Sequence, residues 1–209
     1  MKKFSIFIFS IFLFFGEARS ETPILIPLIH PEDTETLPER VQDIALFNRR
    51  PFISSYWIRP PVIRVCESSG VTVRRAERAA DFWRRLGYTI GDIFMDSGTG
   101  VCGSDGLPGE IIILLVSSDI PMEDNIALTR TYYYTSSRQI IRSQIYINTY
   151  SAEKERVLEH EIGHALGWMH YNRSYHIMHR DYKRGGHNTS GLRYNEYTSQ
   201  SQRINQQGD

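Results

Sequence analysis

The 209-residue sequence lacks several features that would assign it to a class at once. It has only two cysteines, its 24 basic residues balance its 24 acidic residues, and it contains no visible internal repeat. Because neither sign of charge is in excess, nothing indicates binding to nucleic acid or to anionic lipid. The length suits a single domain of ordinary size.

Long apolar runs are also missing, except for one at the N-terminus. Two lysines precede an apolar stretch over residues 4–15, and the small residues Ala18 and Ser20 follow it. This order is typical of a secretory signal peptide, with cleavage expected after Ser20. An uncleaved anchor is the alternative, but a mostly apolar stretch of twelve residues is too short to span a bilayer comfortably. We expect residues 1–20 to be a signal peptide, the mature protein to be secreted or periplasmic, and no stable membrane insertion after the signal is removed.

The two cysteines, Cys66 and Cys102, belong to the expected mature chain. Removal of residues 1–20 takes away three basic residues and one acidic residue, which leaves 21 against 23 and a net charge of about −2. Because an exported protein with an even cysteine count usually pairs them, we expect one disulfide. The closed loop of about 37 residues would contribute roughly 3 to 4 kcal/mol in the chain-entropy model.

Most of the helices and strands that the sequence predicts come after the first quarter of the chain. Prolines at positions 23, 27, 31 and 38 interrupt residues 21–55, which we interpret as an N-terminal arm or a short propeptide, with one short helix over residues 37–47. Further on, apolar periodicity predicts a helix over residues 71–86 and a second helix over residues 152–166 that Ser151 would cap. Strands are expected at residues 61–66, 88–95, 110–117, 126–134 and 139–148.

The second of these helices carries most of the chemistry in the sequence. Residues 160–170 follow the pattern H-E-x-x-H-x-x-G-x-x-H. Helical residues four apart share a face, so His160 and His164 can reach one metal ion, with Glu161 beside them as a proton acceptor. Gly167 has no Cβ and can turn the chain back, which would bring His170 to the same ion. Three protein nitrogens with one open position are typical of catalytic zinc.

This segment resembles the active-site helix of the metzincin metallopeptidases, whose signature is the same motif followed by a Met-turn. The resemblance implies that Met178, eight residues after His170, forms a hydrophobic floor beneath the histidines. It departs from the matrixin pattern at Tyr171, and from the astacin and serralysin pattern at Arg180, where those families carry a tyrosine. Tyr182 and Arg180 remain open as stabilisers of an oxyanion.

The resemblance also implies a fold. The order of elements over residues 56–184 is similar to a metzincin catalytic domain, which implies an α+β fold. We expect a twisted, mostly parallel sheet of about five strands with an antiparallel edge strand, two main helices, and a small C-terminal subdomain after the zinc helix. Strand 126–134 is the candidate for the exposed edge beside the cleft. The polar tail over residues 185–209 is expected to be disordered.

The function implied by the resemblance is that of a secreted zinc-dependent endopeptidase with one Zn²⁺ ion, Glu161 as general base, and a protein or peptide as substrate. Two alternatives stay open: a non-catalytic binding or surface protein on a metzincin scaffold, and a processing or cell-wall peptidase of narrow specificity. A cysteine that caps the zinc is the alternative to the disulfide. The oligomeric state is open, with a monomer expected.

Overall fold

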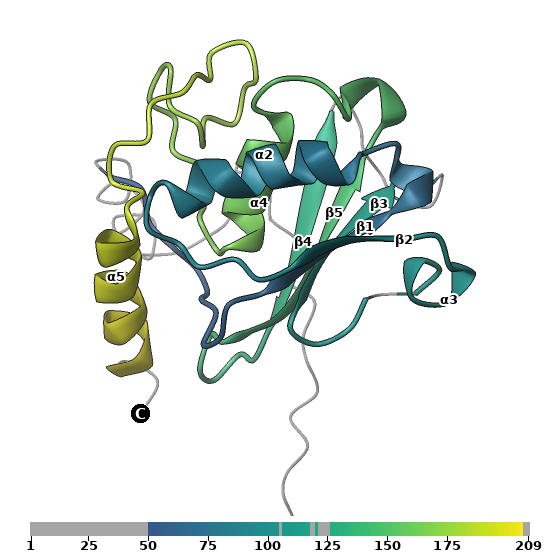
Figure 1. Cartoon of the computed structure of the whole chain (residues 1–209). Helices are drawn as coiled ribbons and strands as arrows, with labels where there is room; N and C mark the ends of the chain where they lie inside the picture. The colour runs from purple at the N-terminus through teal and green to yellow at the C-terminus, as the bar shows by residue number, and fades with distance from the viewer. Residues whose placement is uncertain (1–49, 105, 118–119, 121–125, 207–209) are drawn as a thin grey trace, which may run out of the picture.

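A computed structural model describes residues 50–104, 106–117, 120 and 126–206 of the chain. It shows one sheet with helices packed against it and a further helix near the C-terminus (Figure 1). The expected signal peptide and the expected helix over residues 37–47 lie outside the described residues, as does most of the arm over residues 21–55.

The sheet has five strands in the order β2-β1-β3-β5-β4. In chain order the strands are β1 (Val62–Cys66), β2 (Ile93–Asp96), β3 (Glu110–Leu115), β4 (Ala127–Tyr133) and β5 (Ile140–Ile147). All neighbouring pairs are parallel except β4 with β5, which is antiparallel. The expectation of an α+β fold with a mostly parallel sheet and an antiparallel edge strand is therefore confirmed.

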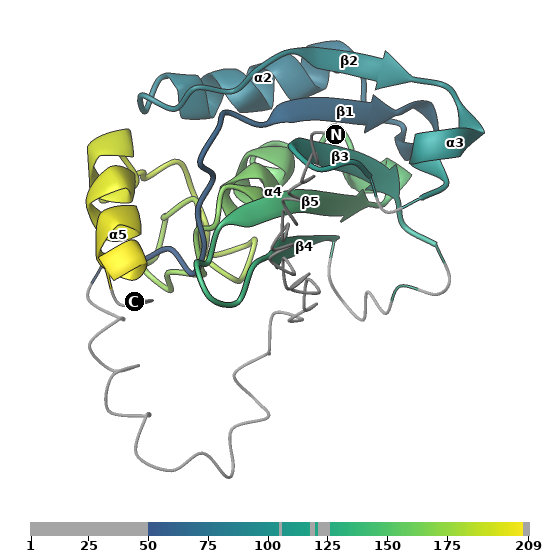
Figure 2. The same cartoon turned by 90° about the horizontal axis from the view of Figure 1, so that it is seen from below.

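Two helices cover one face of this sheet and contact each other, α2 (Val73–Arg84) and α4 (Val157–Ala165) (Figures 1 and 2). Thr72 caps α2 by accepting a hydrogen bond from the backbone N–H of Arg75. The core between the helices and the sheet is built mainly from apolar side chains. It includes Ile63, Ile111, Ile113 and Ile145 from the strands and Ala76, Ala80, Trp83, Leu158 and Ile162 from the helices.

The opposite face of the sheet is covered by a second, smaller cluster. Ile112 and Leu114 of β3 point to this side, where they pack with the disulfide between Cys66 and Cys102. The continuous apolar run of β3 is thus buried on both faces, as its sequence predicts. Both cysteines are paired, so neither is available to cap a metal ion. A 3-10 turn, η2 (Glu67–Ser69), and the short helix α3 (Thr99–Cys102) flank the disulfide.

The helix that carries the metal motif starts later than expected. The sequence predicts a start near residue 152 with Ser151 as the cap, but α4 begins at Val157. Residues 148–154 form tight turns instead, including η3 (Thr149–Ser151), in which the N–H groups of Ser151 and Lys154 bond to carbonyls three residues back. Arg156 precedes α4 with a left-handed backbone (φ 69°), which breaks continuity with these turns.

The expectation of a disordered tail is wrong for residues 194–206, which form helix α5 (Tyr194–Gln206). One buried side chain, Tyr197, anchors this otherwise polar helix, and its ring lies 5.3 Å from Tyr88 and 6.1 Å from Trp168. A prediction based on the low average hydrophobicity of this segment overlooks a helix that is held by a single buried residue. None of the helices in the described part of the chain is both long enough and apolar enough to cross a bilayer.

The disulfide gives a first prediction. Replacement of both cysteines, Cys66→Ser with Cys102→Ser, should lower the free energy of unfolding by about 3 to 4 kcal/mol, because the unfolded chain regains the entropy of an open loop. Denaturant titration measures this loss. Added reductant should destabilise the parent and leave the double variant unchanged, and equal stability of parent and variant in oxidising buffer would contradict the prediction.

Candidate metal centre

Three histidines converge beside α4, two from the helix and one from the chain that follows it. One ring nitrogen from each of His160, His164 and His170 lies within 4.8 Å of the other two. The Nε2 atoms of His160 and His164 are 3.0 Å apart, and the ring of His170 is centred 4.5 Å from that of His164. His170 is therefore directed towards the other two, although it comes from outside the helix.

Backbone carbonyls fix the orientation of two of these rings. The Nδ1 of His160 lies 2.7 Å from the carbonyl oxygen of Ile177, and the Nδ1 of His164 lies 2.7 Å from that of Trp168. A carbonyl oxygen can only accept, so Nδ1 carries the proton in each ring and Nε2 presents a lone pair. A ring nitrogen turned to a carbonyl while the other faces the centre is the usual arrangement of metal-ligating histidines.

The electrostatics of the cluster favour neutral rings. Burial lowers the pKa of His160, and the positive charge of Arg156 adds to the effect. Burial lowers the pKa of His164 further below its usual value, with contributions from His170 and His160. Neutral imidazoles are the form that binds metals.

The ring nitrogens of the three histidines indicate whether a metal ion would fit between them. Two lone pairs face each other across 3.0 Å at His160 and His164, with both available ring protons directed elsewhere. A cation between the nitrogens removes this repulsion. Three imidazoles suit zinc and its transition-metal neighbours rather than calcium or magnesium, which prefer oxygen ligands. The three histidines present therefore fit a zinc ion.

Gly167 makes the return to His170 possible for two reasons. Its φ is 104°, a left-handed conformation that favours glycine, and its N–H bonds to the carbonyl of His164 to close the helix. A Cβ at this position would also collide with the backbone carbonyl oxygen of Ser55, which packs against the turn. A side chain here would displace the segment that carries the third histidine.

Met178 lies directly against the helix, next to the histidines. It is fully buried. A Cβ built at Gly163, the residue before His164, would lie 2.5 Å from the Sδ of Met178 and 2.7 Å from the ring of Trp83. The glycine in the middle of the motif thus lets the thioether approach the backbone of α4. The residue before Met178, Ile177, supplies the carbonyl that orients His160.

Glu161 is buried beside the cluster and is held by a residue that sequence reasoning missed. The hydroxyl of Thr129 on β4 donates to its Oε2 at 2.6 Å. Burial raises the pKa of Glu161 to about 7, and the hydrogen bond from Thr129 acts in the opposite direction. Side chains alternate between the two faces of a strand, so the sequence of strand 126–134 could have placed Thr129 on the inner face. Nothing in the sequence pairs it with Glu161.

The two open candidates for oxyanion stabilisation, Arg180 and Tyr182, both lie in the loop that follows Met178. The hydroxyl of Tyr182 donates to the carbonyl of Glu155 at 3.1 Å, and the guanidinium of Arg156 lies 4.6 Å from the centre of its ring. The backbone N–H of Arg180 points to Asn172 at 3.5 Å. Tyr182 therefore ties the loop after Met178 to the start of α4.

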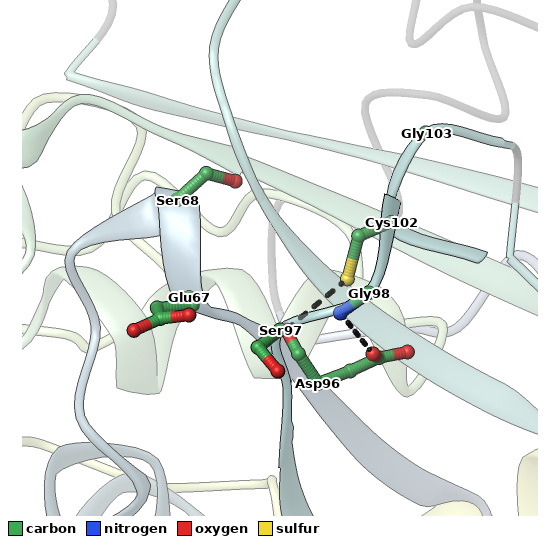
Figure 3. Close-up of a pocket in the computed structure, with 7 residues that line it drawn as sticks. All are labelled: Glu67, Ser68, Asp96, Ser97, Gly98, Cys102 and Gly103. Carbon is green, nitrogen blue, oxygen red and sulfur yellow. Dashed lines mark hydrogen bonds between the residues drawn. The ribbon is translucent and has the colours of Figure 1, made fainter. Parts of the chain in front are cut away.

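A surface pocket lies elsewhere, beside the disulfide, where β1 and β2 end (Figure 3). Glu67 and Asp96 contribute carboxylates to its lining, together with Cys102. Asp96 is already engaged, because it pairs with Arg64 at 2.6 Å and accepts a hydrogen bond from the N–H of Gly98. None of the histidines of the cluster lines this pocket, so we place the candidate site at α4 on the basis of side-chain chemistry.

Comparison with known proteins adds nothing to this geometry: no model of a protein family matches the chain, and the search of curated proteins finds no match. The three histidines and their arrangement alone indicate a metal centre.

The cluster predicts stoichiometric metal binding. The purified protein should bind about one zinc ion, and His170→Ala should weaken the affinity by more than about 100-fold, because one of three ligands is lost. Competition with a chromophoric chelator measures the affinity. His187→Ala is the matched control, since His187 is exposed and pairs with Glu155 outside the cluster. Parental zinc affinity in His170→Ala would exclude His170 as a ligand.

Close packing at Gly163 gives a separate prediction about stability. Alanine in place of a helical glycine ordinarily stabilises by about 0.5 to 1 kcal/mol. Gly163→Ala should instead destabilise by about 1 to 3 kcal/mol, because the methyl group overlaps Met178 and Trp83. Gly100→Ala in α3, where nothing lies within 4 Å of the added Cβ, is the control. Denaturant unfolding measures both, and a stabilised Gly163→Ala protein contradicts the packing described.

Proposed function

We propose that this protein is a zinc-dependent endopeptidase of the metzincin type that acts outside the cytoplasm. The observation that supports the proposal most is the convergence of three imidazole nitrogens within 4.8 Å, next to the buried carboxylate Glu161. The H-E-x-x-H-x-x-G-x-x-H spacing and the thioether of Met178 packed on the helix agree with it. The disulfide is consistent with an oxidising compartment.

His160, His164 and His170 would hold the ion through neutral ring nitrogens. When bound, zinc supplies a Lewis acid that polarises a carbonyl and lowers the pKa of water. The role we propose for Glu161 is to accept the proton of the attacking water and to pass it to the leaving nitrogen. Burial makes its carboxylate more basic than an exposed one, and Thr129 holds one of its oxygens in place.

The edge strand β4 offers a place for an extended substrate. It pairs with β5 on one side, and in the described part of the chain no strand pairs with its other side. Thr129 of β4 contacts the carboxylate of Glu161, so this edge runs beside the proposed general base. A peptide could add to the edge by backbone hydrogen bonds, as in β-strand addition. Main-chain recognition of this kind suits an endopeptidase.

The alternative function, a binding protein without turnover, would not require Glu161 as a proton acceptor. A scaffold that only binds has no use for a buried carboxylate, whose desolvation is unfavourable. Glu161 is kept in place here, with Thr129 positioned to hold it. We therefore favour catalysis, and the following substitution distinguishes the two functions.

Glu161→Gln should retain zinc and lose cleavage of an unfolded protein substrate by about 10²- to 10⁴-fold, because an amide cannot accept the proton. Substrate cleavage and zinc content are measured on the same sample. Glu155→Gln is the matched control, since its side chain is exposed before α4. Cleavage by Glu161→Gln at the parental rate would contradict the mechanism, whereas a parent that binds zinc and cleaves no member of a broad peptide library would favour the binding protein.

A further inference from the structure

A short segment near the beginning of the described chain lies along the turn between the second and third histidines. We call this segment, residues 51–57, the strap. The N–H of Ser54 donates to the carbonyl of Gly167 at 2.9 Å, and the N–H of Met169 donates to the carbonyl of Phe52 at 3.0 Å. Together these bonds form an antiparallel bridge between the strap and the turn. The turn is therefore paired like a strand, although it belongs to no sheet.

The turn over residues 167–169, which the strap holds, influences the positions of two histidines. Residues 167–169 connect His164 to His170, so their position sets where the third ring can lie. The carbonyl of Trp168 also accepts the hydrogen bond that orients His164. The strap reaches the end of α4 as well, because the indole N–H of Trp57 donates to the carbonyl of Ala165 at 2.8 Å.

Helix α5 holds the strap from the other side. The side-chain amide of Gln200 accepts from the N–H of Ile53 at 3.0 Å and donates to the carbonyl of Pro51 at 3.3 Å. The hydroxyl of Tyr197 accepts from the N–H of Trp57 at 2.8 Å. α5 thereby satisfies backbone groups of the strap that the turn at residues 167–169 leaves unpaired.

We propose that Gln200 and Tyr197 are positioning residues for the metal centre, which act through the strap and the turn on His164 and His170. This inference rests on the proposed metal site. No residue of α5 belongs to the histidine cluster, so the effect is one of preorganisation: a turn paired on its outer side keeps two ring nitrogens where an ion needs them. Loss of the supporting hydrogen bonds lets the turn shift, and ligand geometry shifts with it.

Gln200→Leu tests the proposal in the whole chain, because it removes both side-chain hydrogen bonds to the strap at similar volume. Zinc affinity should fall by about 10-fold, as is common when residues that support ligands are changed. Gln202→Leu makes the same change at an exposed position of α5 and should leave the affinity within about twofold of the parent. Chelator competition at a temperature well below unfolding measures zinc affinity.

Tyr197→Phe is a milder second variant that keeps the ring and removes only the acceptor for Trp57. Its zinc affinity should fall by about threefold, which keeps the test open if Gln200→Leu folds poorly. The visible absorption spectrum of the Co²⁺-loaded protein reports ligand geometry directly, and we expect it to change in both variants and not in Gln202→Leu. Thermal unfolding of the zinc-free proteins reports the loss of stability separately.

The outcomes separate this inference from the proposed function. If the parent binds zinc and both variants match its affinity and Co²⁺ spectrum while only their unfolding temperatures fall, α5 is merely structural and the inference is wrong. If the parent binds no zinc, the inference and the proposed metal site fail together. If zinc binding responds to Gln200→Leu as expected but Glu161→Gln still cleaves, the inference stands and the proposed mechanism fails.

Discussion

The arrangement of the metal centre depends on two hydrogen bonds from imidazole N–H groups to backbone carbonyls. The carbonyls of Ile177 and Trp168 take the Nδ1 protons of His160 and His164, which leaves both Nε2 lone pairs directed inwards. Both carbonyls belong to irregular chain after α4, so the helix alone cannot orient its own histidines. The loops that follow it must return to it first, and their packing is therefore part of the site.

Two glycines allow that return, each by letting another part of the molecule come close. Gly163 admits Met178 against the backbone of α4, and Gly167 admits the carbonyl of Ser55 against the turn. Thr129 reaches Glu161 from the edge strand in the same region. The proposed catalytic groups are thus held from three sides, by the sheet, by the loop around Met178 and by the strap. Ligands fixed in this way need little reorganisation when an ion binds.

Most of the fold was predictable because strongly periodic segments leave few choices. Four of the five strands and α2 lie within two residues of their expected bounds, since alternating or continuous apolar runs decide which face is buried. The strand expected at residues 88–95 is shorter and starts later, at Ile93. The start of α4 was predicted wrongly because turns over residues 148–154 use the backbone groups that a helix would need. Helix α5 was missed because its single buried anchor, Tyr197, depends on distant partners at Tyr88 and Trp168.

The sequence alone determined the candidate chemistry: the spacing of His160, Glu161 and His164 on one helical face follows from 3.6 residues per turn, whatever the rest of the chain does. Only the tertiary structure decided the geometry of the site. It brought His170 to within contact of the other rings, paired Thr129 with Glu161, and placed the strap between α5 and the turn. The contact between Thr129 and Glu161 and the contact between the strap and α5 join residues 32 and 147 positions apart, and local periodicity carries no information about which distant groups will meet.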